Sequence, residues 1–80
     1  QIDRCETFMR ENGFHTFRVR YHGDTARIEV GLDELGRIID DEMRGRVLTE
    51  FKDAGFTYVA LDLQGYRTGS MNEGTALDNS

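Results

Sequence analysis

The sequence predicts a small α+β domain, a two-layer sandwich in which helices cover one face of a three-stranded sheet. Apolar residues recur at helical spacing at the start of the chain and again in its middle. Two adjoining stretches alternate apolar and charged residues, and a short apolar stretch follows the second helical region. These observations give the element order α-β-β-α-β. With 80 residues, the chain is long enough for one such domain and too short for a second.

The first helix is expected over residues 2–12, where apolar residues recur at steps of three and four: Ile2, Cys5, Phe8 and Met9. Gly13 follows at the position where a left-handed glycine commonly ends a helix. Because Cys5 lies on the apolar stripe and has no base near it in the sequence, we expect its thiol to pack in the core rather than to act as a nucleophile.

A β-hairpin is expected next, because Gly23-Asp24 separates the two alternating stretches and suits a type II′ turn. This turn pairs Phe17 with Val30, Arg18 with Glu29, Val19 with Ile28, Arg20 with Arg27, Tyr21 with Ala26 and His22 with Thr25. In this register the apolar residues of both strands share one face. The other face collects Arg18, Arg20, His22, Arg27 and Glu29.

The second helical region, residues 33–54, carries apolar residues at steps of four: Leu35, Ile39, Met43, Val47 and Phe51. Steps of four drift by about 40° each on a helix of 3.6 residues per turn, so the stripe would leave the core. We therefore expect a break at residues 40–42, where Asp40 or Asp41 can cap a new helix. Gly55 ends this region, and a third strand is expected over residues 58–63 with Val59, Leu61 and Leu63 inward.

The unit of helix, Gly-Phe, strand and Gly occurs twice, around Gly13-Phe14 and around Gly55-Phe56. A helical crossover makes the second and third strands parallel, and we expect the first strand to lie between them, in the order 2-1-3. Residues 1–73 are expected to form the domain and residues 74–80 a frayed tail. The expected core contains Phe17, Val19, Ile28, Val47, Phe51, Val59 and Leu61.

The composition and the absence of known motifs in the sequence exclude several classes of function. Fifteen acidic residues against ten basic ones give a net charge of −5, so an anion site would have to be a local arginine cluster. No apolar run is long enough to span a membrane, and the single cysteine cannot form an internal disulfide; both predict a cytoplasmic protein that does not enter membranes. No glycine loop precedes a helix and no Cys/His set has metal spacing, so the chain shows no catalytic or metal motif.

The arginines of the hairpin form such a local cluster. Arg18 and Arg20 project from the same side of one strand, with Arg27 opposite Arg20, and guanidinium forks bind phosphate and carboxylate in a bidentate manner. The alternative is that Glu29 and Asp62 neutralise these arginines on a solvated face, and the spacing alone favours neither. After the third strand, a stretch rich in Gly, Ser and Asn is either a ligand-binding segment or a simple C-terminal turn.

Four stretches of the chain resemble the C-terminal region of the LarE-type ATP-dependent sulfur transferases, in the PP-loop ATP pyrophosphatase superfamily: residues 18–24 (RVRYHGD), 26–30 (ARIEV), 55–56 (GF) and 61–72 (LDLQGYRTGSMN). The resemblance extends over about residues 2–73. It implies a longer parent enzyme whose N-terminal domain binds ATP and Mg and activates a carboxylate of a pyridinium mononucleotide by adenylylation. The parent then inserts sulfur from a protein cysteine or an iron–sulfur cluster, on the way to the nickel-pincer cofactor of lactate racemase. The fragment itself is expected to hold no cofactor and to be non-catalytic.

The resemblance also implies roles for individual residues. It assigns Arg18 and Arg20 to a substrate phosphate or carboxylate and makes Arg67, Ser70 and Asn72 candidates for the same site or a subunit contact. The hairpin register adds Arg27 to the expected substrate-binding residues, because it lies opposite Arg20. The implied partners are the parent's own ATP-binding domain, further copies in a homo-oligomer, and a phosphate-bearing small molecule. The alternatives are a non-catalytic oligomerisation module and an RNA-binding accessory module. The net charge and the single aromatic expected on the exposed strand face, Tyr58, disfavour RNA.

Overall fold

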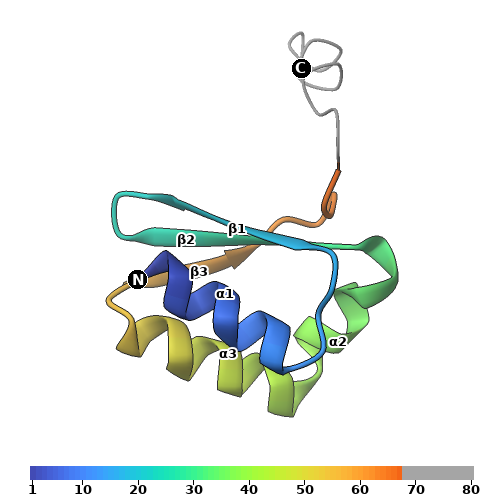
Figure 1. Ribbon diagram of the computed structural model, residues 1–80, viewed down its shortest axis with the longest axis horizontal. Coiled ribbons are helices and arrows are strands. Elements are labelled where there is room, and N and C mark those ends of the chain that lie inside the picture. Colours follow the sequence, from blue (N-terminus) through green and yellow to red (C-terminus); the bar gives the residue numbers. More distant parts are fainter. Residues whose placement is uncertain (68–80) are drawn as a thin grey trace, which may run out of the picture.

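The structure, a computed structural model, describes residues 1–67 and has a three-stranded sheet with its helices on one face (Figure 1). The elements are α1 (Ile2–Glu11), β1 (Phe17–His22), β2 (Thr25–Val30), a 3-10 turn (Leu32–Glu34), α2 (Leu35–Ile39), α3 (Asp41–Asp53) and β3 (Tyr58–Leu61). The predicted α+β class and the α-β-β-α-β order are confirmed. The predicted tail, residues 74–80, and the last part of the predicted domain lie outside the described residues.

The hairpin of β1 and β2 has the predicted register at all six pairs, from Phe17 with Val30 to His22 with Thr25. Gly23 has a φ of +63°, and Asp24 has no positive φ, as a type II′ turn requires. The apolar face packs under the helices, with Val19, Ala26 and Ile28 buried. Tyr21 is 66% exposed, because it lies on an edge strand beside the hairpin turn, where the helix layer ends (Figure 1).

The predicted strand order 2-1-3 is wrong: the observed order is β1-β2-β3. β2 pairs with β1 on one side and, in parallel, with β3 on the other, so only the predicted parallel relation of β2 and β3 holds. The crossover through α2 and α3 returns the chain directly beside the strand that it left, as consecutive parallel strands usually do. β2 suits the central place, because four of its six residues are buried, whereas β1 carries the charged side chains typical of an edge.

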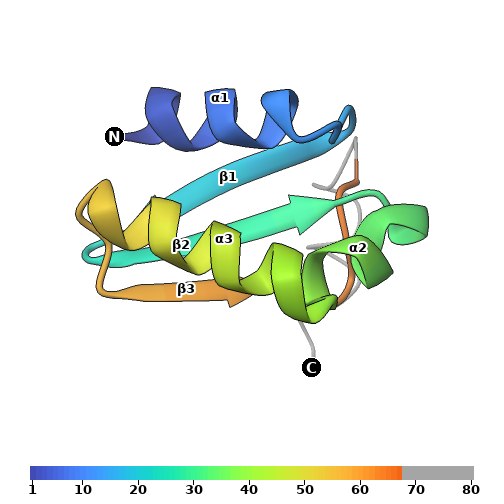
Figure 2. The ribbon, with the colours of Figure 1, turned by 90° about the horizontal axis from the view of Figure 1, so that it is seen from below.

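The second helical region breaks at Asp40, as predicted. Asp40 has extended backbone angles, φ −58° and ψ 137°, and its carboxylate accepts a hydrogen bond from the Met43 amide at 3.4 Å. The break rotates α3 relative to α2, so α3 returns Val47 and Phe51 to the core. The helices α1 and α3 lie side by side over the sheet, with α2 at one end (Figure 2).

β3 is shorter than predicted, and Leu63 does not face inward: it is 76% exposed. The chain turns directly after Leu61. The Asp62 carboxylate accepts from the Gln64 amide at 2.9 Å, and the Asp62 carbonyl accepts from the Gly65 amide at 3.1 Å. This turn interrupts the alternation on which the prediction for Leu63 depended.

The two helix–Gly-Phe–strand units end their helices in the same way. Gly13 and Gly55 have φ values of +89° and +114°, and each is followed by a buried phenylalanine. The Phe14 amide donates to the Met9 carbonyl at 3.1 Å, and the Phe56 amide donates to the Phe51 carbonyl at 3.2 Å. These are the bonds of a Schellman C-cap, which requires a left-handed residue at the glycine position. The predicted repeat is therefore structural.

The core lies between the helices and the sheet. Of the predicted core residues, Val19, Ile28, Val47 and Phe51 are buried, while Phe17, Val59 and Leu61 are partly buried against them. Cys5 is fully buried in the same core, which confirms its packing role. Within residues 1–67, no helix has the length and apolar character to cross a membrane.

Candidate functional site

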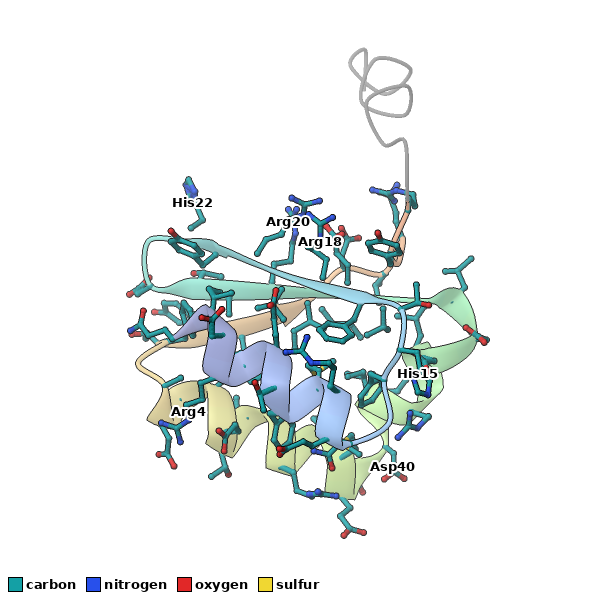
Figure 3. The ribbon with its side chains drawn as sticks, viewed as in Figure 1. Arg4, His15, Arg18, Arg20, His22 and Asp40 are labelled. Atoms are coloured by element: carbon teal, nitrogen blue, oxygen red, sulfur yellow. The ribbon has the colours of Figure 1, made fainter. Side chains whose placement is uncertain are left out.

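The arginine cluster, defined as Arg18, Arg20 and Arg27, lies on the face of the sheet opposite the helices. Arg18 and Arg20 project from β1 in the same direction, away from α1 and α3 (Figure 3). Arg27 on β2 is the register partner of Arg20. The predicted gathering of the three guanidinium groups on one surface is therefore correct.

Glu29 bridges two members of the arginine cluster. Its Oε2 accepts from Arg20 Nε at 2.9 Å and from Arg27 Nη2 at 3.2 Å, and the residue is only 5% exposed. Asp62 Oδ2 lies 3.9 Å from Arg27 Nε. Two arginines directly opposite each other would weaken a hairpin, and Glu29 offsets that repulsion. The alternative of neutralisation by Glu29 and Asp62 thus holds for Arg20 and Arg27.

Arg18 differs from its two neighbours. Its guanidinium lies over the Tyr66 ring, with 5.8 Å between Cζ and the ring centroid, and within residues 1–67 it makes no ion pair with a carboxylate. Three cations against two carboxylates leave the cluster with one net positive charge. An exposed guanidinium held against an aromatic ring keeps its donors available to an incoming phosphate or carboxylate.

The segment after β3 brings Tyr66 to this face. The Asp62 amide donates to the Ile28 carbonyl at 2.9 Å, and the Tyr66 amide donates to the Val30 carbonyl at 2.7 Å, so the segment runs along the end of β2. Gly65, with a φ of +82°, permits this close approach. A Cβ at Gly65 would lie 2.9 Å from both the Val30 carbonyl oxygen and Leu32 Cδ2.

Of the remaining predicted site residues, the structure describes Arg67 alone. Arg67 is half-buried in the segment after β3, and its Nη1 donates to Gln64 Oε1 at 2.8 Å. Ser70 and Asn72 lie outside the described residues. Sequence reasoning missed Tyr66 as a partner of Arg18, because no local pattern indicates that the segment after β3 continues along β2 and bonds to its last residue.

Other chemistries have less support in the described part of the chain. Burial raises the pKa of the Cys5 thiol, which disfavours the nucleophilic thiolate. No group of three metal-ligating side chains occurs within residues 1–67. A hollow of about 290 Å³ beside β3 is lined by apolar residues of α2, α3 and β3 together with Arg44. The arginine cluster is therefore the surface best suited to an anionic ligand.

Comparison with known proteins agrees with the family resemblance. The chain is 41% identical over 73 residues to the pyridinium-3,5-bisthiocarboxylic acid mononucleotide synthase of Lactiplantibacillus plantarum, a match that covers 91% of this chain and 26% of that protein. It is 35% identical over 72 residues to an uncharacterized protein of Synechocystis, covering 90% of this chain and 27% of that protein. It is also 34% identical over 68 residues to an uncharacterized protein of Methanocaldococcus jannaschii, covering 85% and 26%.

The chain thus spans about a quarter of the length of the curated relatives that it matches. No family model matches it. The resemblance to a C-terminal LarE-type domain, expected from four stretches of sequence, is confirmed by the similarity to the synthase over nine-tenths of the chain.

Proposed function

We propose that this chain is the substrate-binding part of an ATP-dependent sulfur transferase in nickel-pincer cofactor biosynthesis, and that its arginine cluster holds the anionic groups of a pyridinium mononucleotide. The 41% identity to the synthase supports the pathway. The observation that carries the binding role is the exposed Arg18 beside Arg20 on the open sheet face. The proposal includes a cytoplasmic, homo-oligomeric parent whose other domain binds ATP and Mg.

The spacing of the two arginines suits this role. Residues two apart on a strand are separated by about 6.6 Å, so two guanidinium groups can approach one phosphate or a phosphate and a carboxylate together. Arg20 uses Nε for Glu29, which leaves its terminal nitrogens for a ligand. Holding a substrate at two points restricts its motion and prepares it for attack by groups of the other domain.

Titration of the chain with inorganic phosphate and with a pyridinium mononucleotide tests the binding role. We expect the NMR signals of Arg18, Arg20 and Arg27 to shift, with weak affinity because the rest of the parent is absent. Arg18→Ala is the sharpest variant, since it breaks no ion pair in the described part of the chain, and it should weaken binding at least tenfold. Arg44→Ala, on the helix side of the sheet, is the matched control and should bind as the wild type does.

The corresponding test in the parent protein separates substrate binding from assembly. Arg18→Ala should reduce sulfur transfer more than tenfold, about 1.4 kcal/mol, with an unchanged melting temperature. An oligomerisation module is the second candidate, because no carboxylate within residues 1–67 pairs with Arg18 and a neighbouring subunit could supply one. If Arg18→Ala dissociates the oligomer and leaves the activity per subunit intact, the assembly role is correct and the substrate role is wrong.

The same proposal assigns no ATP chemistry to this chain. The purified 80 residues should not hydrolyse ATP, because no phosphate-binding glycine loop occurs in them. Saturable ATP hydrolysis by the purified chain would contradict the proposal that the other domain of the parent carries out the ATP chemistry.

A further inference from the structure

We infer that Glu29 is a positioning residue: it holds Arg20 by Nε so that the terminal nitrogens of Arg20 remain free to bind an anion. This inference rests on the proposed anion-binding function. Glu29 is the buried polar residue of the described chain, and one of its oxygens, Oε2, accepts from both Arg20 and Arg27. A buried carboxylate beside a proposed anion site calls for an explanation, because its charge repels the ligand.

The atoms that Glu29 engages explain its place. A guanidinium presents two edges that can grip an oxyanion, one containing Nε and one formed by the two terminal nitrogens. Glu29 binds Arg20 only at Nε, at 2.9 Å, and so occupies the first edge and leaves the second. Restricting a long, flexible side chain in this way reduces the entropy that binding would otherwise cost.

Arg27 receives a different role from the same geometry. Its Nη2 donates to Glu29 at 3.2 Å, and its Nε faces Asp62 at 3.9 Å, so carboxylates engage it at two atoms. Arg27 thus fixes Glu29, Glu29 fixes Arg20, and the Tyr66 ring supports Arg18. Arg18 and Arg20 are the ligand-binding pair, and Arg27 acts through Glu29.

Two substitutions of Glu29 that change the net charge equally separate the effect of its hydrogen bonds from the effect of its charge. Glu29→Gln removes the negative charge but keeps an oxygen that can accept from Arg20 and Arg27. Glu29→Ala removes both the charge and the acceptor. Any effect of net charge on anion affinity is the same in both variants, so a difference between them measures the hydrogen bonds.

The experiment is the dissociation constant for inorganic phosphate of the 80-residue chain and of both variants. We expect Glu29→Gln to bind at least as tightly as the wild type and Glu29→Ala at least fivefold more weakly than Glu29→Gln. Glu50, paired with Arg4 on the helix layer, is the control: Glu50→Gln and Glu50→Ala should bind phosphate equally. Equal affinity of Glu29→Gln and Glu29→Ala would overturn the inference.

A second measurement needs no ligand. The Nε–H signal of Arg20 should exchange slowly with water in the wild type and in Glu29→Gln, and it should broaden or vanish in Glu29→Ala. If wild-type chain shows no phosphate binding, the proposed function fails, while this signal still decides the positioning role. If Glu29→Ala does not fold, Glu29→Leu replaces it, because a side chain of similar volume fills the site without an acceptor. A persistent Arg20 signal in either apolar variant would overturn the positioning role.

Discussion

The two helix–Gly-Phe–strand units, α1 with β1 and α3 with β3, share a local structure but are held in different surroundings. Residues 42 positions apart correspond: Gly13 with Gly55, Met9 with Phe51, and Tyr21 with Leu63, which are both exposed. α3 begins at a side-chain cap on Asp40, whereas the N-cap of α1, Gln1, makes no such bond. The similar sequence patterns of the two units therefore give the same C-cap, whereas the N-caps of α1 and α3 differ.

The ends of the two units differ more. At the end of α1, Arg37 of α2 donates to the Asn12 carbonyl at 2.6 Å and lies 4.2 Å from the Phe14 ring centroid. After β1, Gly23 has open space around it, whereas after β3, Gly65 is packed against Val30 and Leu32. The comparison shows that the local sequence pattern determines the helix, C-cap and strand of each unit. Contacts with distant residues determine how much space surrounds the glycine that follows each strand.

The largest expected effect on the free energy of unfolding is at the corresponding core positions Met9 and Phe51, which are both fully buried. Phe51→Ala should cost about 3–5 kcal/mol of unfolding free energy, and Met9→Ala should cost less, because it removes a smaller side chain. Urea unfolding of the two variants measures the difference. A loss below about 1 kcal/mol for Phe51→Ala would show that the two units do not share one core.

The second-largest effect is expected at Gly23 and Gly65, the glycines that follow β1 and β3, where the same substitution should lower the stability by different amounts. Gly23→Ala should cost about 1 kcal/mol, because only the backbone conformation is strained. Gly65→Ala adds a clash with the Val30 carbonyl and Leu32, so we expect a further cost of about 1–3 kcal/mol. Thermal melting of both variants tests this order. Equal losses would mean that the segment after β3 moves away at little cost.

The capped and uncapped helix starts provide a smaller contrast. Asp40→Ala should cost about 1 kcal/mol, since it removes the acceptor for the Met43 amide. Asp40→Asn keeps an acceptor and should remain close to the wild type. Gln1→Ala should change the unfolding free energy by a few tenths of a kcal/mol at most. Chemical denaturation of the three variants decides whether the caps of the two units differ as described.

The smallest expected effect is a loss of stability at alkaline pH that is caused by the Cys5 thiol. Cys5 and Val47 occupy corresponding positions, and burial raises the pKa of the Cys5 thiol above its ordinary value of 9.0. The unfolded chain therefore loses this proton first, so stability decreases as pH rises above the ordinary thiol pKa, until the pKa of the folded state is passed. Cys5→Val should remove this decrease and leave stability at neutral pH nearly unchanged. Identical pH profiles for wild type and variant would contradict the buried thiol.

Features encoded within a dozen residues were predictable, and those that depend on distant contacts were not. The hairpin register followed from the Gly23-Asp24 turn, and the helix break followed from the drift of the apolar stripe at Asp40. The order of the strands depends on how the crossover packs, which no single stretch of sequence records. The arginine cluster was predictable because both of its strands belong to the hairpin. Its contact with Tyr66 was not, because it depends on how the segment after β3 packs against the end of β2.

The sheet combines two pairings of very different range along the chain, and this has a kinetic consequence. Pairs in the hairpin are separated by 3 to 13 residues, whereas each pair of β2 and β3 is separated by 33. Short loops close faster, so we expect the hairpin, with Arg20, Glu29 and Arg27, to form before β3 docks. Asp62 and Tyr66 would then arrive late, and in pulse-labelled hydrogen exchange the amide of Arg27, which pairs with Arg20 inside the hairpin, should gain protection before that of Tyr66. A nascent chain would thus carry a charged hairpin whose Arg18 is still without its aromatic support.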